Sequence, residues 1–120
     1  MKRVIITGGT GGLGTAISDV FFKTGWEVVS LGSKDLDFSD RYAVEAFFRA
    51  EPCDLLVCAA GETADMPLAR MPEPTWDRLF SLNYEAAMWA ATAAIPGMAK
   101  RGSGHVVFIS SHAAIHPAIG

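Results

Sequence analysis

The sequence has no run of basic residues, and it is acidic overall, with a formal net charge of −3 and a pI near 5.5. Nucleic acids and anionic membrane surfaces attract basic patches, so we expect neither as a partner. Long apolar runs are also missing. The uncharged stretch 86–99 has 14 residues and contains Pro96, which makes it too short to cross a bilayer. No cleavage-site pattern precedes the first glycines, and we expect a cytoplasmic protein.

Cysteine is scarce, since the chain has only Cys53 and Cys58. The two lie five residues apart in one expected strand, which places them on opposite faces of the sheet. Their number and spacing match neither a disulfide framework nor a zinc site, so we expect no bound metal. A buried Cys58 that packs as a small apolar side chain is a better interpretation than a reactive thiol.

What the sequence does contain is an alternation of strand and helix patterns. Apolar and β-branched runs typical of buried strands cover residues 3–7, 26–31, 36–38 (a short one), 54–60 and 105–110. Alternation of this kind implies right-handed crossovers and a parallel sheet. We therefore expect one α/β domain over residues 1–120, a Rossmann-like doubly wound parallel sheet with strand order 3-2-1-4-5, truncated after strand 5.

Helical spacing of apolar residues fills the gaps between these strands. The first helix follows the glycines at 8–14 and ends at Gly25, and Ser39 or Asp40 caps the second. A long helix starts near Thr75 and runs toward Met98, with Pro96 kinking or closing its last turn. In such a fold ligands bind at the carboxyl ends of the strands where the strand order reverses.

The stretch "TGGTGGLG" (residues 7–14) lies at that edge and fits three phosphate-loop patterns at once. Glycines between a strand and a helix let backbone N–H groups approach a pyrophosphate, whose charge the helix N-terminus favours. A turn that only lets helix and strand pack closely is the simpler alternative. The loop by itself does not select among the three sets of glycines, which are Gly9-Gly11-Gly14, Gly8-Gly12-Gly14 and Gly8-Gly11-Gly14.

Four stretches together resemble the short-chain dehydrogenase/reductase family in its single-domain branch. They are T-G-x-x-x-G-x-G at 7–14, Ala59-Ala60-Gly61 after a strand, Asn83 within "WDRLFSLNYEAAM", and Ser110-Ser111 at the end of the last strand. The resemblance covers essentially the whole chain. It implies the glycine set 8, 12 and 14, with Gly9 and Gly11 adding flexibility within the turn. The extended branch, with the set 8, 11 and 14, fits the residues after Ser111 less well.

The resemblance also implies a role for each matched residue. The cofactor's phosphates and ribose would be contacted by Gly8, Gly12, Leu13 and Gly14. Asp37 would bind the adenine amino group, and the adenine–ribose region would be lined by Ala59, Ala60 and Gly61. Asn83 would belong to the catalytic set, and Ser111 would hold the substrate oxygen, while Ser110 is structural.

The positions of Asn83 and Ser111 in the sequence also support interpretations that do not depend on the family resemblance. Asn83 lies four residues from both Leu79 and Ala87 and three from Phe80 and Ala86, so we expect it on an apolar helix face, buried and with hydrogen-bond partners. Its structural alternative is a bridge to a neighbouring strand. The alternative for Ser111 is turn chemistry at a strand end.

The end of the second strand bears on the choice between NAD and NADP. In this family an acidic residue there binds the ribose 2′-hydroxyl and selects NAD, but Gly32 stands at that place. Ser33 and Lys34 follow, a hydroxyl and a cation suited to a 2′-phosphate, although Asp35 lies close by. We expect NADP(H) as the preferred cofactor, with NAD as the alternative.

The family's Tyr-x-x-x-Lys pair is not found in these 120 residues. Tyr42 and Tyr84 are the only tyrosines, and Ala46 and Met88 stand four residues after them. We therefore expect a catalytically incomplete portion of an oxidoreductase that interconverts an alcohol and a carbonyl. The alternatives are a non-enzymatic NAD(P)-binding sensor or scaffold, and one half of a split enzyme. An apolar edge at strand 5 and exposure around Trp89 predict a homo-oligomer or a complementing chain.

Overall fold

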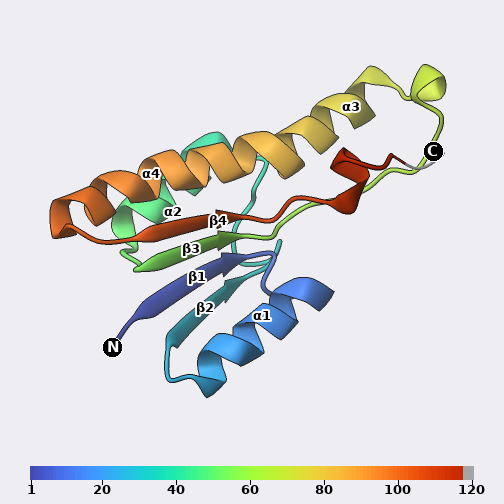
Figure 1. The fold of residues 1–120 in the computed structure, drawn as a ribbon. Coiled ribbons are helices and arrows are strands. Elements are labelled where there is room, and N and C mark those ends of the chain that lie inside the picture. Colours follow the sequence, from blue (N-terminus) through green and yellow to red (C-terminus); the bar gives the residue numbers. More distant parts are fainter. Residues whose placement is uncertain (118–120) are drawn as a thin grey trace.

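The computed structural model describes residues 1–117, in which a parallel sheet lies between two helical layers (Figure 1). The strands are β1 (Arg3–Thr7), β2 (Glu27–Leu31), β3 (Leu55–Cys58) and β4 (His105–Phe108). The helices are α1 (Gly12–Lys23), α2 (Arg41–Ala50), α3 (Glu73–Phe80) and α4 (Ala86–Arg101). A π-helical turn, Ser81–Glu85, joins α3 to α4, and single 3-10 turns cover Leu68–Arg70 and His112–Ala114.

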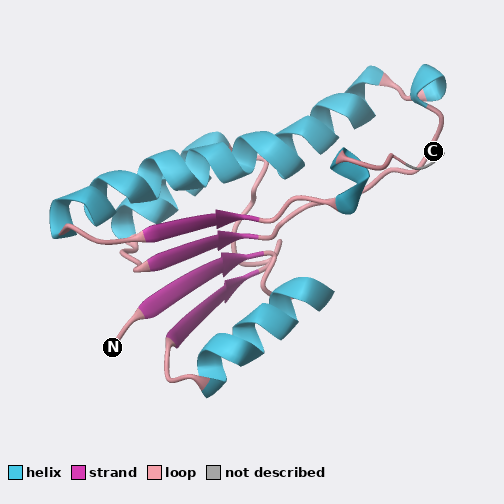
Figure 2. Cartoon of the chain, viewed as in Figure 1, coloured by secondary structure: helices cyan, strands magenta, loops and turns pink. Residues whose placement is uncertain are grey.

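The four strands run in the same direction in the order β2-β1-β3-β4 (Figure 2). Each lies within a stretch that the apolar runs predict. The strands β1 to β4 correspond to the first, second, fourth and fifth apolar runs. Their order is the expected order 3-2-1-4-5 without its third strand. The doubly wound α/β class is therefore confirmed, and the reversal of strand order falls between β1 and β3 as expected.

The expected short strand at 36–38 is wrong, because this segment forms consecutive turns. The Asp35 carboxylate accepts a hydrogen bond of 2.8 Å from the Gly32 N–H, and the Asp37 carboxylate accepts 2.9 Å and 2.6 Å bonds from the Ser39 N–H and hydroxyl. Aspartate side chains that bind the nearby backbone favour turns over strand pairing. The apolar signal came from Phe38, which is buried in the core without belonging to the sheet.

Alternate residues of the strands face two separate cores, as side chains on a strand must. Ile5 and Leu56 face the layer of α2 and α4, whereas Val4 and Ile6 face α1, and all four are fully buried. Figure 1 shows α1 alone on one side of the sheet and the other helices on the opposite side. The central strands β1 and β3 are thus buried on both faces, which explains why they are apolar throughout.

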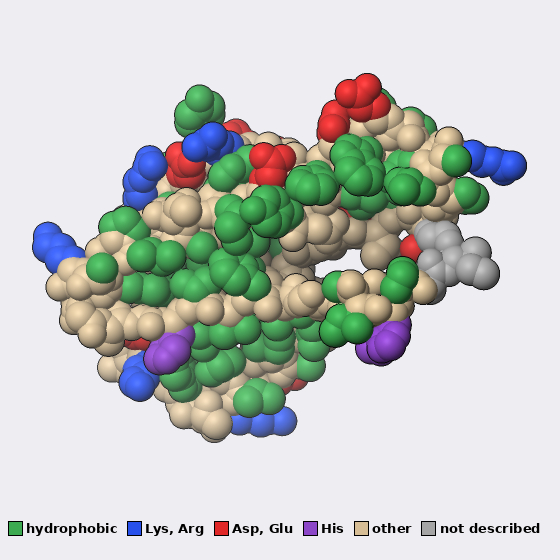
Figure 3. All heavy atoms as spheres, turned by 45° about the horizontal axis from the view of Figure 1, so that its top comes forward, with side chains coloured by type: hydrophobic (Ala, Val, Ile, Leu, Met, Phe, Trp, Pro, Cys, Tyr) green, Lys and Arg blue, Asp and Glu red, His purple; other side chains and the backbone are tan. Residues whose placement is uncertain are grey.

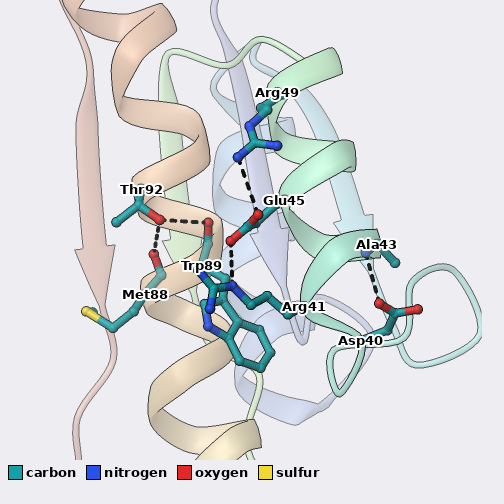
Figure 4. Close-up of polar contacts among 8 residues, drawn as sticks. All are labelled: Asp40, Arg41, Ala43, Glu45, Arg49, Met88, Trp89 and Thr92. Carbon is teal, nitrogen blue, oxygen red and sulfur yellow. Dashed lines mark hydrogen bonds and ion pairs between the residues drawn. The ribbon is translucent and has the colours of Figure 1, made fainter.

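Asp40 is the N-cap of helix α2, which decides between the two predicted caps, Ser39 and Asp40. Its carboxylate accepts a 3.1 Å hydrogen bond from the Ala43 N–H. Further along the helix, Glu45 binds Arg41 at 2.8 Å and Arg49 at 3.3 Å, each one turn away (Figure 4). Pairs at this spacing add a few tenths of a kcal/mol each to an exposed helix.

Pro96 lies inside α4 and does not close it, contrary to one of the two outcomes expected. The helix continues to Arg101 and ends at Gly102, whose φ of 77° is left-handed. Pro96 removes the N–H that would bind the Thr92 carbonyl. Both residues lie on the exposed side of α4, where solvent can replace the missing hydrogen bond, and the helix continues past Pro96.

The free edge of β4 is apolar, as the sequence predicts. Val107, Phe108 and Ile109 are 41%, 49% and 41% exposed, and β4 is the last strand of the sheet among the described residues. Trp89 itself is half-buried against the core, and Ile95 and Tyr84 are the exposed apolar residues near it. Figure 3 shows hydrophobic side chains gathered on this face, along α3 and α4. Within residues 1–117 no helix combines the length and apolarity needed to cross a membrane.

The two-sided core makes a prediction about stability. Phe48 is 2% exposed between α2 and α4, whereas Phe22 on α1 is 73% exposed. We expect Phe48→Ala to lower the free energy of unfolding by about 3–5 kcal/mol, because it leaves a cavity. Phe22→Ala is the matched control and should change that free energy by less than about 0.5 kcal/mol. Urea unfolding followed by circular dichroism measures both, and equal losses would contradict the assignment of the core.

Candidate functional site

The ends of β1 and β3 meet in a backbone contact that only glycine permits. Gly8 has a φ of 69°, and a Cβ there would lie 2.7 Å from the Cα and N of Ala60. Thr7 is buried, and its hydroxyl accepts a 3.3 Å hydrogen bond from the Ala60 N–H. The turn after β1 and the loop after β3 are therefore held against each other at the carboxyl edge of the sheet.

The other loop glycines divide into packed and open positions. A Cβ on Gly14 would overlap the Gly8 carbonyl oxygen, and one on Gly9 would lie 2.7 Å from the Cβ of Ser30. Gly9 is thus required for packing against β2, and its interpretation as spare flexibility is wrong. Gly11 makes only ordinary contact, and a Cβ on Gly12 meets nothing within 4 Å.

Helix α1 presents uncapped N–H groups to the same edge. Its N-cap is Gly11, which has no side chain to accept a hydrogen bond, and the first helical bond runs from the Thr15 N–H to the Gly11 carbonyl. The N–H groups of Gly12, Leu13 and Gly14 have no acceptor within the helix. Together with the positive end of the helix dipole they form a place for an anionic group.

The end of β2 is shaped by two interactions at Gly32. A Cβ on Gly32 would lie 2.5 Å from the Thr10 hydroxyl oxygen, so Thr10 packs closely against this glycine. The Gly32 N–H donates a hydrogen bond to the Asp35 carboxylate. The Asp35 carboxylate is therefore used in the turn. Ser33 and Lys34 occupy that turn, and both are exposed.

A pocket of about 480 Å³ opens beside this turn. Asp37 lines it, with only Oδ1 of its carboxylate bound by Ser39 and no protein partner recorded for Oδ2 among the described residues. The hydrogen bonds from the Ser39 hydroxyl and backbone N–H lower the pKa of Asp37, so it is a charged acceptor at neutral pH. The pocket also has apolar walls, formed by Leu36, Phe38 and Leu82.

A larger pocket of about 740 Å³ brings together residues that the sequence places far apart. Figure 3 shows the molecule hollowed here, between α3 and the segment after β4. Among its lining residues are five of the predicted site residues: Ala59, Ala60, Gly61, Asn83 and Ser111. Gly8 adjoins it through Ala60. Neither pocket is lined by Gly12, Leu13, Gly14 or Lys34, which lie on the turn and at the end of β2.

Asn83 has the expected partners but is exposed, so the prediction that it is buried is wrong. Its Oδ1 accepts a 3.1 Å bond from the Glu62 N–H, and its Nδ2 donates to the Glu62 and Leu79 carbonyls at 2.8 and 2.9 Å. Asn83 belongs to the π-helical turn, whose wider spacing breaks the 3.6-residue period on which the prediction of burial rested. A Cβ on Gly61 would lie 2.5 Å from Oδ1, so this bridge requires glycine there.

Ser111 is an exposed hydroxyl at the mouth of the larger pocket. Its Oγ accepts a 3.1 Å hydrogen bond from the Ala113 N–H and caps the 3-10 turn that follows. This cap is the turn chemistry that was its structural alternative. A hydroxyl oxygen that accepts a hydrogen bond from Ala113 still has its own proton to donate. The cap therefore holds the Ser111 side chain in place and leaves its O–H available as a donor.

Several residues at the site carry no signal in the sequence. Glu62 and Arg78 form a 2.8 Å ion pair and both line the smaller pocket, and Tyr84 and Met88 line the larger one. These positions depend on how α3 crosses the edge of the sheet, which no local pattern encodes. Thr7 begins the glycine stretch, but its hydroxyl contact depends on the loop after β3, which no local pattern places beside it.

Cys58, at the end of β3, is buried and free, as is Cys53. Burial raises the pKa of the Cys58 thiol to about 12. The thiolate is therefore absent at neutral pH, and the interpretation of Cys58 as a small apolar side chain is confirmed.

The model of the short chain dehydrogenase family matches residues 33–120 of this chain. A 3-oxoacyl-(acyl-carrier-protein) reductase from Rickettsia typhi is 31% identical, over 92% of this chain and 54% of its own length. The NADP-dependent 3-hydroxy acid dehydrogenase YdfG of Escherichia coli is 29% identical, over 98% of this chain and 57% of its own length. The chain thus spans about half the length of these two curated relatives.

Among solved structures, serine dehydrogenase from Escherichia coli superposes with a TM-score of 0.81. It is 24% identical and the match covers 98% of this chain and 65% of the other. This likeness confirms the fold.

The buried thiol predicts a pH dependence of stability. Folding raises the pKa of Cys58 from 9.0 to about 12. The stability that the protonated thiol contributes to the folded state is therefore fully present below pH 9 and is lost as the pH rises from 9 toward 12. Over that window the free energy of unfolding should fall by up to about 1.4 kcal/mol per pH unit. Cys58→Ala should remove this part of the slope, and an unchanged slope would contradict the assignment. Native Cys58 should also resist iodoacetamide at pH 8 until urea unfolds the chain.

Proposed function

Since the chain belongs to the short-chain dehydrogenase family, we propose that it is the cofactor-binding part of an NAD(P)-dependent oxidoreductase that interconverts an alcohol and a carbonyl. One observation carries the proposal. The glycine turn before α1, the Asp37 pocket and the pocket with Asn83 and Ser111 all open at the carboxyl edge of the sheet, side by side. An extended dinucleotide needs three such compartments, for its pyrophosphate, adenosine and nicotinamide parts.

The glycine turn fits a pyrophosphate in its packing as well as its charge. Gly8 and Gly14 are required by neighbouring backbone, but Gly12 faces open space. The protein's own packing does not require glycine at position 12, so the absence of a side chain there is explained if a bound group approaches the backbone. The N–H groups of Gly12, Leu13 and Gly14 would then bind the phosphates, which supports the set 8, 12 and 14.

The adenosine part fits the smaller pocket. The free Oδ2 of Asp37 is an acceptor for an adenine amino group, and Leu36 and Phe38 give the base an apolar wall. Ala59, Ala60 and Gly61, which lie between this pocket and the glycine turn, would pass beneath the adenine and its ribose.

NADP(H) is the cofactor that the end of β2 favours. Thr10 packs against Gly32 where an acidic side chain would select NAD, and the nearby Asp35 carboxylate is used by the Gly32 N–H. Ser33 and Lys34 are exposed in the same turn. A hydroxyl and an ammonium there would bind a 2′-phosphate by charge-assisted hydrogen bonds.

The larger pocket is the place for the substrate and the nicotinamide, which supplies or accepts a hydride when the cofactor is bound. The Ser111 hydroxyl, oriented by its bond to Ala113, would donate to the substrate oxygen. Asn83 would fix the π-helical turn and the loop after β3 on the opposite wall through its bonds to Glu62. We propose a small alcohol or carbonyl compound as the substrate.

Assembly and location complete the proposal. The exposed apolar edge of β4 supports a homo-oligomer or a complementing chain. Two free cysteines support a reducing compartment such as the cytoplasm.

Substitution of single loop glycines tests cofactor binding and the choice of glycine set. Gly12→Ala should leave the chain folded, since its Cβ meets no protein atom, but should weaken NADPH binding by about tenfold or more, worth about 1.4 kcal/mol. Gly11→Ala is the control, because Gly11 belongs only to the two alternative sets. Calorimetric titration with NADPH measures both. Equal affinities for Gly12→Ala and the unmodified chain would overturn the proposed set.

Cofactor preference gives a second test. NADPH should bind about tenfold more tightly than NADH, and Lys34→Gln should reduce that ratio by about tenfold, because a charge-assisted bond contributes about 1.5–3 kcal/mol. The NADH affinity of the variant serves as the internal control and should stay unchanged. Tighter binding of NADH than of NADPH by the unmodified chain would contradict the preference.

A further inference from the structure

Glu62 occupies a place that no assigned role explains, because it lines both pockets. It follows Gly61 in the loop after β3 and, among residues 1–117, it alone lines both the 740 Å³ and the 480 Å³ pocket. The wall between the two compartments is therefore built around this residue. Any movement of Glu62 changes the shape of both.

Three hydrogen bonds, one of which is also an ion pair, tie Glu62 to α3 and the π-helical turn that follows it. The backbone N–H and carbonyl of Glu62 both bind the Asn83 carboxamide, at 3.1 and 2.8 Å. Its carboxylate Oε2 accepts from Nη2 of Arg78 at 2.8 Å. The backbone and the side chain are thus held to the same helix at residues 78 and 83, more than one turn apart.

The ion pair adds orientation and little stability. The side chains of Arg78 and Glu62 are 65% and 38% exposed, and exposed pairs contribute about 0–1 kcal/mol to folding. Both side chains line the smaller pocket together with Asp37. Breaking the pair would leave the fold in place and release the wall on the side of α3.

We infer that Glu62 and Arg78 are positioning residues, whose ion pair sets the wall between the two pockets and thereby the adenosine compartment. The inference rests on the proposed function, since it takes the smaller pocket as the adenosine site. Asn83 fixes the backbone of Glu62 in this wall, and the ion pair with Arg78 fixes the position of the Glu62 side chain. An adenine nucleotide that contacts Asp37 meets a preformed surface, and it loses affinity when the surface has to be ordered on binding.

The test uses adenosine 2′,5′-bisphosphate, a probe that lacks the nicotinamide half. Glu62→Gln and Arg78→Gln should each weaken its binding by about two- to fivefold, the effect of a pair worth up to about 1 kcal/mol. The double variant should be no weaker than either single one. The reversed pair Glu62→Arg with Arg78→Glu should recover most of the affinity. Every variant should still unfold in one cooperative thermal transition, with its midpoint lowered by no more than the few degrees that correspond to about 1 kcal/mol.

The chain offers a matched control in Arg41 and Glu45. This pair has the same 2.8 Å separation, and the Arg41 side chain is 61% exposed, but it lies on α2 and lines neither pocket. Arg41→Gln should leave binding unchanged. Affinity at the level of the unmodified chain in Glu62→Gln, additive losses in the double variant, or an equal loss in Arg41→Gln would each overturn the inference.

Hydrogen exchange separates this inference from the proposed function. In the absence of nucleotide, Glu62→Gln should speed exchange of the amides after Gly61 severalfold, because the loop loses its tie to Arg78. Unchanged exchange overturns the positioning role whatever the chain binds. If the unmodified chain binds no adenine nucleotide, the proposed function fails and the adenosine part of the inference fails with it, while the exchange result still decides whether the pair holds the wall.

Discussion

The approach of Gly8 to the backbone of Ala60 is the contact on which the site depends. It brings the turn after β1 within van der Waals distance of the loop after β3, and the Thr7 hydroxyl fixes that distance by binding the Ala60 N–H. Gly14 then packs on the Gly8 carbonyl, so the start of α1 is held in the same place. This one constraint at the reversal of strand order aligns the uncapped end of the helix with the larger pocket, which Ala60 lines.

Local patterns in the sequence predict the fold because the central strands of the sheet are buried on both faces. Runs such as residues 3–7 are apolar without alternation, which is the pattern that two helical layers require. The failures have equally local causes. The carboxylates of Asp35 and Asp37 bind nearby N–H groups and turn a strand-like segment away from the sheet. Pro96 is tolerated within α4 because it and Thr92 lie on the exposed side of the helix, where the lost hydrogen bond does not leave a buried carbonyl.

The site was predictable where it follows from strand ends and unpredictable where it follows from α3. Ala60 and Ser111 come directly after parallel strands, and parallel strands end at a common edge, so their meeting in one pocket follows from the fold class. Asn83 was placed on a buried face because a regular helix was assumed, and a π-helical turn shifts that face. The contact of Glu62 with Arg78 joins a loop to a helix, and neither residue has a periodic neighbour that signals it.

The open space at Gly12 has a consequence for how sequences of this kind diverge. Selection for a stable chain acts on Gly8 and Gly14, whose replacement disturbs the protein itself, but it does not act on Gly12. A descendant that keeps the architecture and abandons its ligand would therefore lose Gly12 first and retain the other two. Among homologues, a side chain at this one position would distinguish inherited shape from inherited binding.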